Sequence, residues 1–167
     1  MARRFRGEGH HKVDNKGRVS VPALFRRVLE AADDNWMDGL NPELVIVYGD
    51  HRRQYLECYT IEAITEVDQK IAALPRGSME RRMLQTLFHG QSFQTAVDET
   101  GRLVLPAKLR RKIDLESQAF FIGAGDTFQI WKYETYEAEE RARTEEWLNA
   151  LPPDVDPLVF LDGLAGG

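Results

Sequence analysis

Cysteine is nearly absent from this chain of 167 residues, and Cys58 alone cannot form an internal disulfide. A reducing compartment such as the cytoplasm fits this usage. No apolar run approaches the roughly 20 residues that a membrane-spanning helix needs. The opening residues, MARRFR, are followed by no apolar stretch, so a signal peptide is not expected. These absences predict a cytoplasmic protein without a membrane partner.

The motifs of common enzyme classes are also missing. The chain has no P-loop GxxxxGK[ST], no HExxH and no CxxC. His10 and His11 are neighbours on a predicted strand, so they point to opposite faces and cannot easily share a metal ion. Cys58 lies in the strand-like run YLECY and is expected to be a small packed side chain. The sequence predicts no catalytic residues, no metal site and no cofactor.

The net charge of −5 argues, by itself, against a nucleic-acid partner. The charge is unevenly distributed, however. Residues 1–27 hold eight basic and two acidic side chains, a net of +6, so the rest of the chain carries −11. A chain of this kind can present one positive surface to phosphate groups while the remainder keeps it in solution.

The basic segment is one copy of an internal repeat. VDNKGRVSVPALFRR at 13–27 recurs 84 residues later as VDETGRLVLPAKLRR at 97–111, which indicates a duplication. A half of about 50 residues buries little core alone. Two halves folded against each other would form one pseudo-twofold β-barrel, of α+β class and mainly β, with peripheral helices.

Each copy is expected to begin with a tight β-hairpin. In the first copy the strands are 11–13 and 18–21; in the second they are 93–97 and 102–105. Asp14 and Asp98 open the turns because their carboxylates can accept turn N–H groups, and Gly17 and Gly101 close them. Pro22 and Pro106 then favour short helices over 22–31 and 106–113.

A second hairpin and a helix complete each half. The predicted hairpins pair 44–50 with 55–59 and 119–126 with 127–131. The next helices should begin at Thr60 and Thr135 as N-caps, the first ending at Pro75 and the second near residue 150. An additional helix is expected over 78–89. Residues 152–167 are expected to be loose.

The two VDxxGR[VL]x[VL]P segments resemble the signature of the MraZ family, whose domains are of the SpoVT-AbrB type. FRG at 5–7 resembles the start of that family, and ERRMLQTLFHG at 80–90 its inter-repeat helix. The resemblance covers about residues 5–150. It implies AbrB-like halves with swapped hairpins, namely domains at 8–59 and 92–135, connecting helices at 60–91, and a C-terminal helix and tail at 136–167.

The resemblance also implies a function. Members of this family are bacterial DNA-binding transcriptional regulators of the division and cell-wall gene cluster, and they bind repeats upstream of their own gene. A ring-shaped homo-oligomer on double-stranded promoter DNA, associated with the nucleoid, is therefore the expectation for this chain, with repression as the expected effect.

The first copy is expected to face DNA. Its turn carries Asn15 and Lys16 where the second has Glu99 and Thr100, and Glu99 repels phosphate. Arg18 is the candidate for base reading, because a guanidinium can bond guanine O6 and N7 together. The candidates for phosphate contact are Lys16, Arg6, Lys12, Arg4 and Arg3.

The remaining motif residues are expected to be structural. Asp14 and Gly17 shape the first turn, and Asp98, Gly101 and Arg102 the second. One alternative for Arg18 is an ion pair with Asp14 that only fastens the turn, and such a pair is the main expectation for Asp98 and Arg102. The arginines of the short helices could serve subunit contacts instead: Arg26, Arg27, Arg110 and Arg111.

A rival interpretation also fits the sequence. AbrB-type folds serve as protein-interaction modules, including antitoxin-like ones, with only weak DNA binding. The acidic final helix and tail would then be the protein-binding surface. A barrel enzyme is a third possibility, and it would need an ordered pocket with convergent polar groups.

Overall fold

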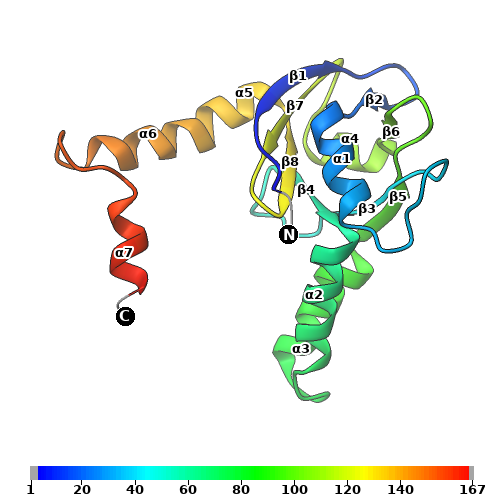
Figure 1. Cartoon of the computed structure of the whole chain (residues 1–167), viewed down its shortest axis with the longest axis horizontal. Coiled ribbons are helices and arrows are strands. Elements are labelled where there is room, and N and C mark those ends of the chain that lie inside the picture. Colours follow the sequence, from blue (N-terminus) through cyan, green and yellow to red (C-terminus); the bar gives the residue numbers. More distant parts are fainter. Residues whose placement is uncertain (1–3, 166–167) are drawn as a thin grey trace. The chain divides into compact units, whose positions relative to one another are not determined.

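The computed structural model describes residues 4–165, which form two compact units, one up to Lys132 and the other from Tyr133. Arg3 lies outside the described residues. Figure 1 shows the strands gathered in the first unit and helices alone in the second.

Between residues 4 and 132, the described part of the first unit, eight strands form two sheets. Six form one antiparallel sheet in the order β1-β7-β8-β4-β3-β5, and the other two form the ribbon β2–β6. The bounds are β1 (Glu8–Lys12), β2 (Arg18–Ser20), β3 (Glu43–Val47), β4 (Tyr55–Thr60), β5 (Ser92–Ala96), β6 (Arg102–Val104), β7 (Gln118–Gly123) and β8 (Thr127–Trp131). The predicted α+β class with mainly strands is confirmed.

The pairing of the strands follows a twofold pattern. β1 pairs with β7 of the second half, and its counterpart β5 pairs with β3 of the first. β2 pairs with its own counterpart β6, as β4 does with β8. If the two halves are exchanged, each ladder therefore maps either onto an equivalent ladder or onto itself.

The predicted local hairpins at the start of each copy are wrong, because their strands separate. β1 and β2 form no ladder with each other, and a single bridge joins Val13, just after β1, to Val19 of β2. Each strand then finds its ladder in the opposite half, as the swapped-hairpin arrangement implies. The second hairpins, β3 with β4 and β7 with β8, are confirmed.

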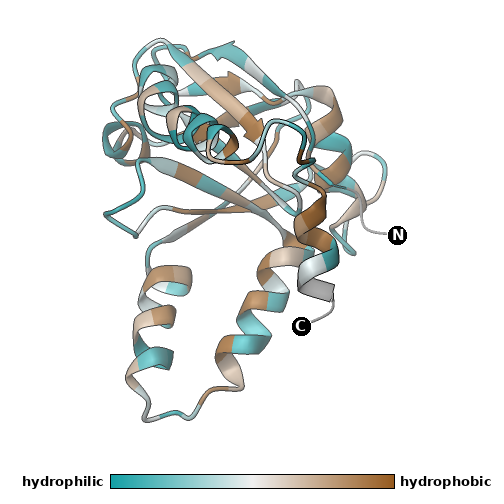
Figure 2. Ribbon diagram, turned by 90° about the vertical axis from the view of Figure 1, so that its left-hand side faces the viewer, coloured by the Kyte–Doolittle hydropathy of each residue, from teal (hydrophilic) through white to brown (hydrophobic). Residues whose placement is uncertain are grey.

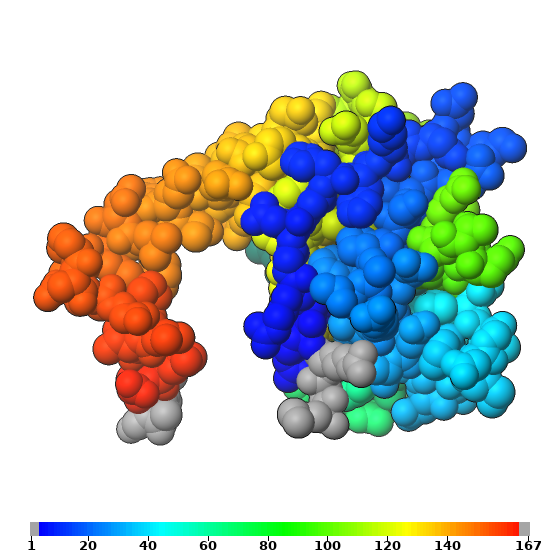
Figure 3. Space-filling model, turned by 45° about the horizontal axis from the view of Figure 1, so that its top comes forward, coloured from blue at the N-terminus to red at the C-terminus, as the bar shows by residue number. Residues whose placement is uncertain are grey.

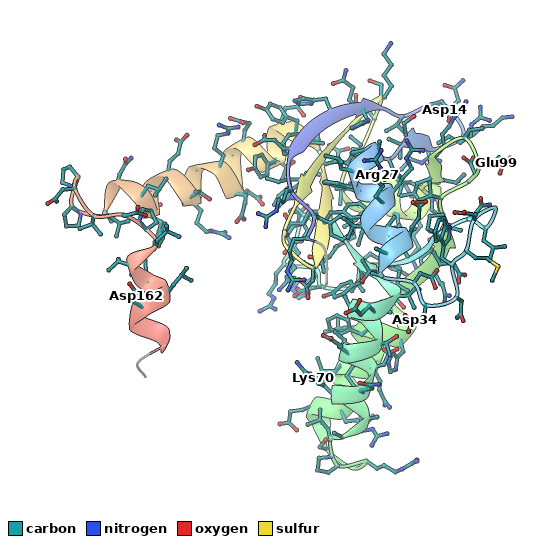
Figure 4. The ribbon with its side chains drawn as sticks, in the orientation of Figure 1. Asp14, Arg27, Asp34, Lys70, Glu99 and Asp162 are labelled. Atoms are coloured by element: carbon teal, nitrogen blue, oxygen red, sulfur yellow. The ribbon has the colours of Figure 1, made fainter. Side chains whose placement is uncertain are left out.

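Short helices follow the ribbon strands. Pro22 and Pro106 directly precede α1 (Ala23–Ala31) and α4 (Ala107–Lys112), which confirms both predicted helices to within a residue or two. Phe25, Leu29 and Leu109 face the core and fix these helices against the sheets. The other side of α1 carries Arg27, which Figure 4 labels.

A helical hairpin projects from the large sheet. It consists of α2 (Ile61–Ala72), α3 (Met79–Gln85) and a π-helical turn, η1 (Thr86–Gly90). The Thr60 hydroxyl accepts the N–H of Ala63 at 2.9 Å, so the predicted N-cap is confirmed. Figure 2 shows apolar stripes along these helices, and Ile64 of α2 is buried in a small cluster near the sheet.

The main core lies between the sheets and helices α1 and α4. Its centre contains aromatic rings, with Phe128 at 5.0 Å from Phe5 and 5.1 Å from Phe25, measured between ring centroids. Cys58 is fully buried, which confirms its role as a packed side chain, and burial raises the pKa of its thiol. Residues of both halves contribute to this core, so one copy of the repeat alone would lack half of the side chains that fill it.

The second unit consists of helices and an irregular, turn-containing segment at 150–158. Its elements are α5 (Tyr133–Tyr136), the π-helical turn η2 (Glu137–Arg141), α6 (Ala142–Asn149) and α7 (Val159–Ala165). The prediction of Thr135 as an N-cap is wrong. Helix α2 begins directly after Thr60, whereas α5 begins directly after Lys132, so Lys132 is the position equivalent to Thr60. Thr135 lies inside α5. The tail expected to be loose contains α7.

Candidate nucleic-acid interface

The central segments of the two repeats form one antiparallel ribbon. Arg18 lies opposite Val104, and Ser20 lies opposite Arg102. Since side chains alternate along a strand, Val19 and Leu103 point inward and are 1% and 0% exposed. The outer face therefore carries the other four side chains: Arg18, Ser20, Arg102 and Val104. The sequence analysis missed Ser20 and Val104 and gave Arg102 only a structural role, although the period of two in RLVL at 102–105 could have indicated this face.

The turn before β2, here called turn one (residues 14–17), is held by a single carboxylate. Asp14 Oδ1 accepts the backbone N–H groups of Lys16 and Arg18, both at 2.9 Å. Gly17 has φ +83°, a conformation that suits glycine. The N–H of Arg18, its guanidinium and the N–H of Lys16 hold the pKa of the Asp14 carboxyl below its ordinary value. The carboxylate thus stays ionised and keeps the turn closed.

The ion pair between Asp14 and Arg18 is present, with Nε to Oδ2 at 2.6 Å. The contact uses only the Nε edge of the guanidinium. Within residues 4–165 the two Nη groups have no bonding partner, and 41% of the Arg18 side chain is exposed. Fastening the turn and reading a base are therefore compatible, because the pair orients Arg18 while its terminal donors stay available.

The equivalent turn before β6, here called turn two (residues 98–101), differs in the side chains that contact its carboxylate. Asp98 Oδ1 accepts the N–H groups of Thr100 and Arg102, as Asp14 does for its neighbours. It also accepts the Thr100 hydroxyl at 2.7 Å. The expected Asp98–Arg102 ion pair is not found among the described side chains. Lys16 is the residue of turn one equivalent to Thr100, and its side chain makes no such bond to the carboxylate of Asp14.

The two turns lie at opposite ends of the ribbon and differ in charge: turn one holds one acidic and one basic side chain, and turn two holds two acidic ones. Lys16 is exposed on turn one, and Lys12, at the adjoining end of β1, is also exposed. Turn two carries the exposed Glu99. Figure 4 labels Asp14 on turn one and Glu99 on turn two, and Figure 3 shows turn one in blue and turn two in green on the same face. The end of the ribbon near Lys12, Lys16 and Arg18 therefore has a net positive charge, whereas at the other end Asp98 and Glu99 outweigh Arg102.

Arg4 and Arg6 lie elsewhere. Phe5 is buried and its N–H donates to the Gly125 carbonyl at 2.7 Å, which fixes this segment beside the turn between β7 and β8. The whole of β1 separates Arg6 from turn one. Arg4 and Arg6 are exposed, but the structure does not bring them together with Lys16 and Arg18.

The arginines of the short helices divide into two kinds. Arg27 and Arg111 are exposed. Arg26 and Arg110 instead lie against Gly101 and Gly17 within the chain. The structure thus places two of the four residues considered for subunit contacts beneath the turns.

The described part of the chain contains no group of three metal-ligating side chains, and none of its helices is long and apolar enough to cross a membrane. A cavity of about 220 Å³ lies between β3, β4 and the helical hairpin. Its charged groups bond one another or the backbone: Arg52 holds the pKa of Asp50 well below its ordinary value, and Lys112 Nζ donates to the carbonyls of Asp50 and Arg53. This arrangement favours a structural role for the cavity's polar side chains.

Comparison with known proteins supplies the family. The chain is 74% identical to the transcriptional regulator MraZ of Ruegeria pomeroyi over 166 residues, which cover 99% of each protein. The chain belongs to the MraZ family. The MraZ of Cereibacter sphaeroides is 43% identical over 169 residues, covering 97% of this chain and 98% of that protein. The resemblance in the repeats is thereby confirmed over nearly the full chain.

More distant members preserve part of the match. The MraZ of Rickettsia bellii is 34% identical over 127 residues, which cover 76% of this chain and 79% of that protein. The family model for the MraZ protein, which is described as antitoxin-like, matches residues 88–150. All of these relatives carry the name transcriptional regulator, so the family is one of regulators rather than of enzymes.

Proposed function

We propose that the chain is a sequence-specific regulator of transcription that reads double-stranded DNA with the outer face of the β2–β6 ribbon. One observation carries the proposal: Arg18 is fixed by Asp14 through Nε, and its terminal donors point to no group of the described chain. Family membership supports the regulatory role.

The ribbon suits the major groove, which admits a two-stranded β-ribbon and displays a distinct pattern for each base pair. Arg18 would bond guanine O6 and N7 end-on through its two Nη groups. Ser20 and Arg102 would reach neighbouring base edges or the backbone from the same face. Lys12 and Lys16 would contact phosphates and set the register without reading sequence.

The wider setting rests on family membership. We infer binding to repeats upstream of the chain's own gene, in the division and cell-wall gene cluster, by a ring-shaped homo-oligomer that represses transcription in the nucleoid. Arg4 and Arg6, at the far end of β1, would then contact phosphates outside the ribbon's own site.

The test is Arg18→Ala, measured by fluorescence anisotropy on a duplex from upstream of the chain's own gene and on a shuffled duplex, across a salt series. The variant should lose roughly tenfold to a hundredfold in affinity for the native duplex, since a bidentate arginine–guanine contact contributes about 1–3 kcal/mol. Binding to the shuffled duplex should change much less.

Arg82→Ala is the matched control, because it removes the same charge from an exposed site on α3. It should leave the preference for the native duplex intact. If the wild-type chain binds both duplexes equally at moderate salt, specific readout by the ribbon is excluded.

The second prediction concerns Glu99 on turn two. Glu99→Lys should tighten binding to the native and the shuffled duplex several-fold and steepen the salt slope by about 1, because a repulsive charge becomes a phosphate contact. Glu66→Lys, on helix α2 away from the ribbon (Figure 1), makes the same change in net charge. An equal gain from both variants would show that only overall charge matters and that turn two is remote from DNA.

A second function is favoured by the C-terminal unit. It is acidic and displays apolar side chains, with Trp147 48% and Leu161 63% exposed, although Trp147 contacts Phe160. Such a surface suits a protein partner, in line with the antitoxin-like description of the family. This interaction role becomes the leading one if the native duplex is not preferred.

A further inference from the structure

Two arginines lie against the turn glycines of the opposite half of the chain. A Cβ atom on Gly17 would come within 2.9 Å of Arg110 Nε, and one on Gly101 within 2.4 Å of Arg26 Nη1. Arg110 belongs to α4 in the second half, and Arg26 to α1 in the first. Each turn is therefore backed by a guanidinium that the other half supplies.

Hydrogen bonds to the backbone also connect the two halves at turn one. The N–H of Leu105 donates to the Gly17 carbonyl at 2.8 Å. Arg110 Nε donates to the carbonyl of that same Leu105 at 2.9 Å. Leu109, only 3% exposed, fixes α4 in the core beside Arg110. A bonded path thus runs from the core through Arg110 and Leu105 to turn one.

The equivalent path at turn two is incomplete. The N–H of Val21 donates to the Gly101 carbonyl at 2.9 Å, as the twofold pattern requires. Arg26 Nε, however, is buried and has no hydrogen-bond partner among the described residues. Turn one, which carries Lys16 and precedes Arg18, is therefore held more firmly by the opposite half than turn two.

We propose that Arg110 is a positioning residue for DNA readout. It holds Gly17, and through turn one the Asp14–Arg18 pair, in the place that the base contact requires, without contacting DNA itself. Displacing Gly17 moves the two N–H groups that Asp14 binds, so the guanidinium of Arg18 moves with them. Contacts of this kind depend on support from the residues behind them. The inference rests on the proposed function, and it makes sequence reading by the first half dependent on the second.

The chain contains its own control, since Arg26 is the pseudo-twofold equivalent of Arg110. Native and shuffled duplexes would be compared by anisotropy for Arg110→Ala, Arg110→Lys and Arg26→Ala, well below the Tm of each variant. Arg110→Ala should reduce the preference for the native duplex by on the order of tenfold, while Arg26→Ala changes it little. Arg110→Lys should not restore the preference, because an ammonium lacks the planar Nε donor.

The salt slope separates positioning from direct contact. A phosphate contact by Arg110 would lower the slope by about 1 in the alanine variant and be recovered by lysine. Positioning predicts an unchanged slope in both. Recovery of preference by Arg110→Lys, or an equal loss in Arg26→Ala, would overturn the proposal.

Amide hydrogen exchange tests the same idea without DNA. Arg110→Ala should speed exchange of the Lys16 and Arg18 amides, which Asp14 holds, and leave Thr100 and Arg102 unchanged. Arg26→Ala should leave exchange of the Lys16 and Arg18 amides unchanged. Unchanged exchange at turn one in Arg110→Ala refutes the inference even if DNA readout by Arg18 stands. An absent duplex preference in the wild-type chain instead refutes the proposed function, and faster exchange in Arg110→Ala would then show only that Arg110 supports turn one.

Discussion

Gly17→Ala is expected to lower the free energy of unfolding by about 3 kcal/mol or more, a large loss for one substitution. The backbone at Gly17 has φ +83°, which costs a residue with a side chain about 1–2 kcal/mol. A Cβ would also lie 2.3 Å from the carbonyl oxygen of Leu105. That oxygen belongs to the backbone of the ribbon's end, so relief requires the two halves to separate. Urea unfolding would measure the loss as a shift in midpoint at constant slope.

Alanine substitutions at two other glycines separate the backbone strain from the steric overlap of the added Cβ. Gly7 has φ +103° and nothing within 4 Å of an added Cβ, so Gly7→Ala should show the backbone strain alone. Gly101→Ala should fall between the two, because its Cβ would meet the end of the Arg26 side chain, which can move. Equal losses at Gly17 and Gly7 would mean that the close approach of the two halves contributes nothing to stability.

These turns also show how far the sequence could predict the fold. The Asp and Gly positions of the repeat correctly predicted the turns, and Pro22 and Pro106 correctly predicted the short helices. They could not predict which strands pair. A period of two specifies the face that a side chain takes, but not the neighbouring strand, and β1 finds its partner 106 residues or more away in β7.

The candidate interface was predictable to a similar degree. Arg18, Lys16 and Lys12 do lie together, because one turn and the adjoining strand ends hold them. Arg6 was grouped with them only by closeness in sequence, and an extended strand carries neighbours apart. The support of Gly17 by Arg110 could not be predicted, since it depends on the crossing of the two halves and not on any local pattern.

The twofold core and the one-sided charge together explain the duplication. Both copies supply the same structural parts, namely turn, ribbon strand and short helix, and each half completes the other. Substitution on the turn surface leaves those parts unchanged, so turn one can carry Lys16 while turn two carries Glu99. One chain is therefore structurally symmetric but has a single basic end, which under the proposed function would face DNA.

A single basic end implies weak binding by one chain, and this leads to the prediction with the largest expected effect. DNA with two or more tandem repeats should bind about 10²- to 10⁴-fold more tightly than DNA with one, provided that the chains associate, because each further contact becomes intramolecular. Anisotropy on probes of equal length with one, two and three repeats would measure the gain. Sedimentation in the same buffer would establish the association.

Spacing provides the control for this prediction. Moving one repeat by about 5 base pairs, half a helical turn, places its major groove on the opposite side of the duplex. Neighbouring ribbons of a rigid assembly could then not bind both repeats, so most of the gain should disappear although every base contact is kept. A gain that survives the shift would indicate flexible linkage between chains. Comparable affinity for one repeat and for several would exclude the ring as the source of tight binding, and the four side chains of one ribbon face would have to provide it alone.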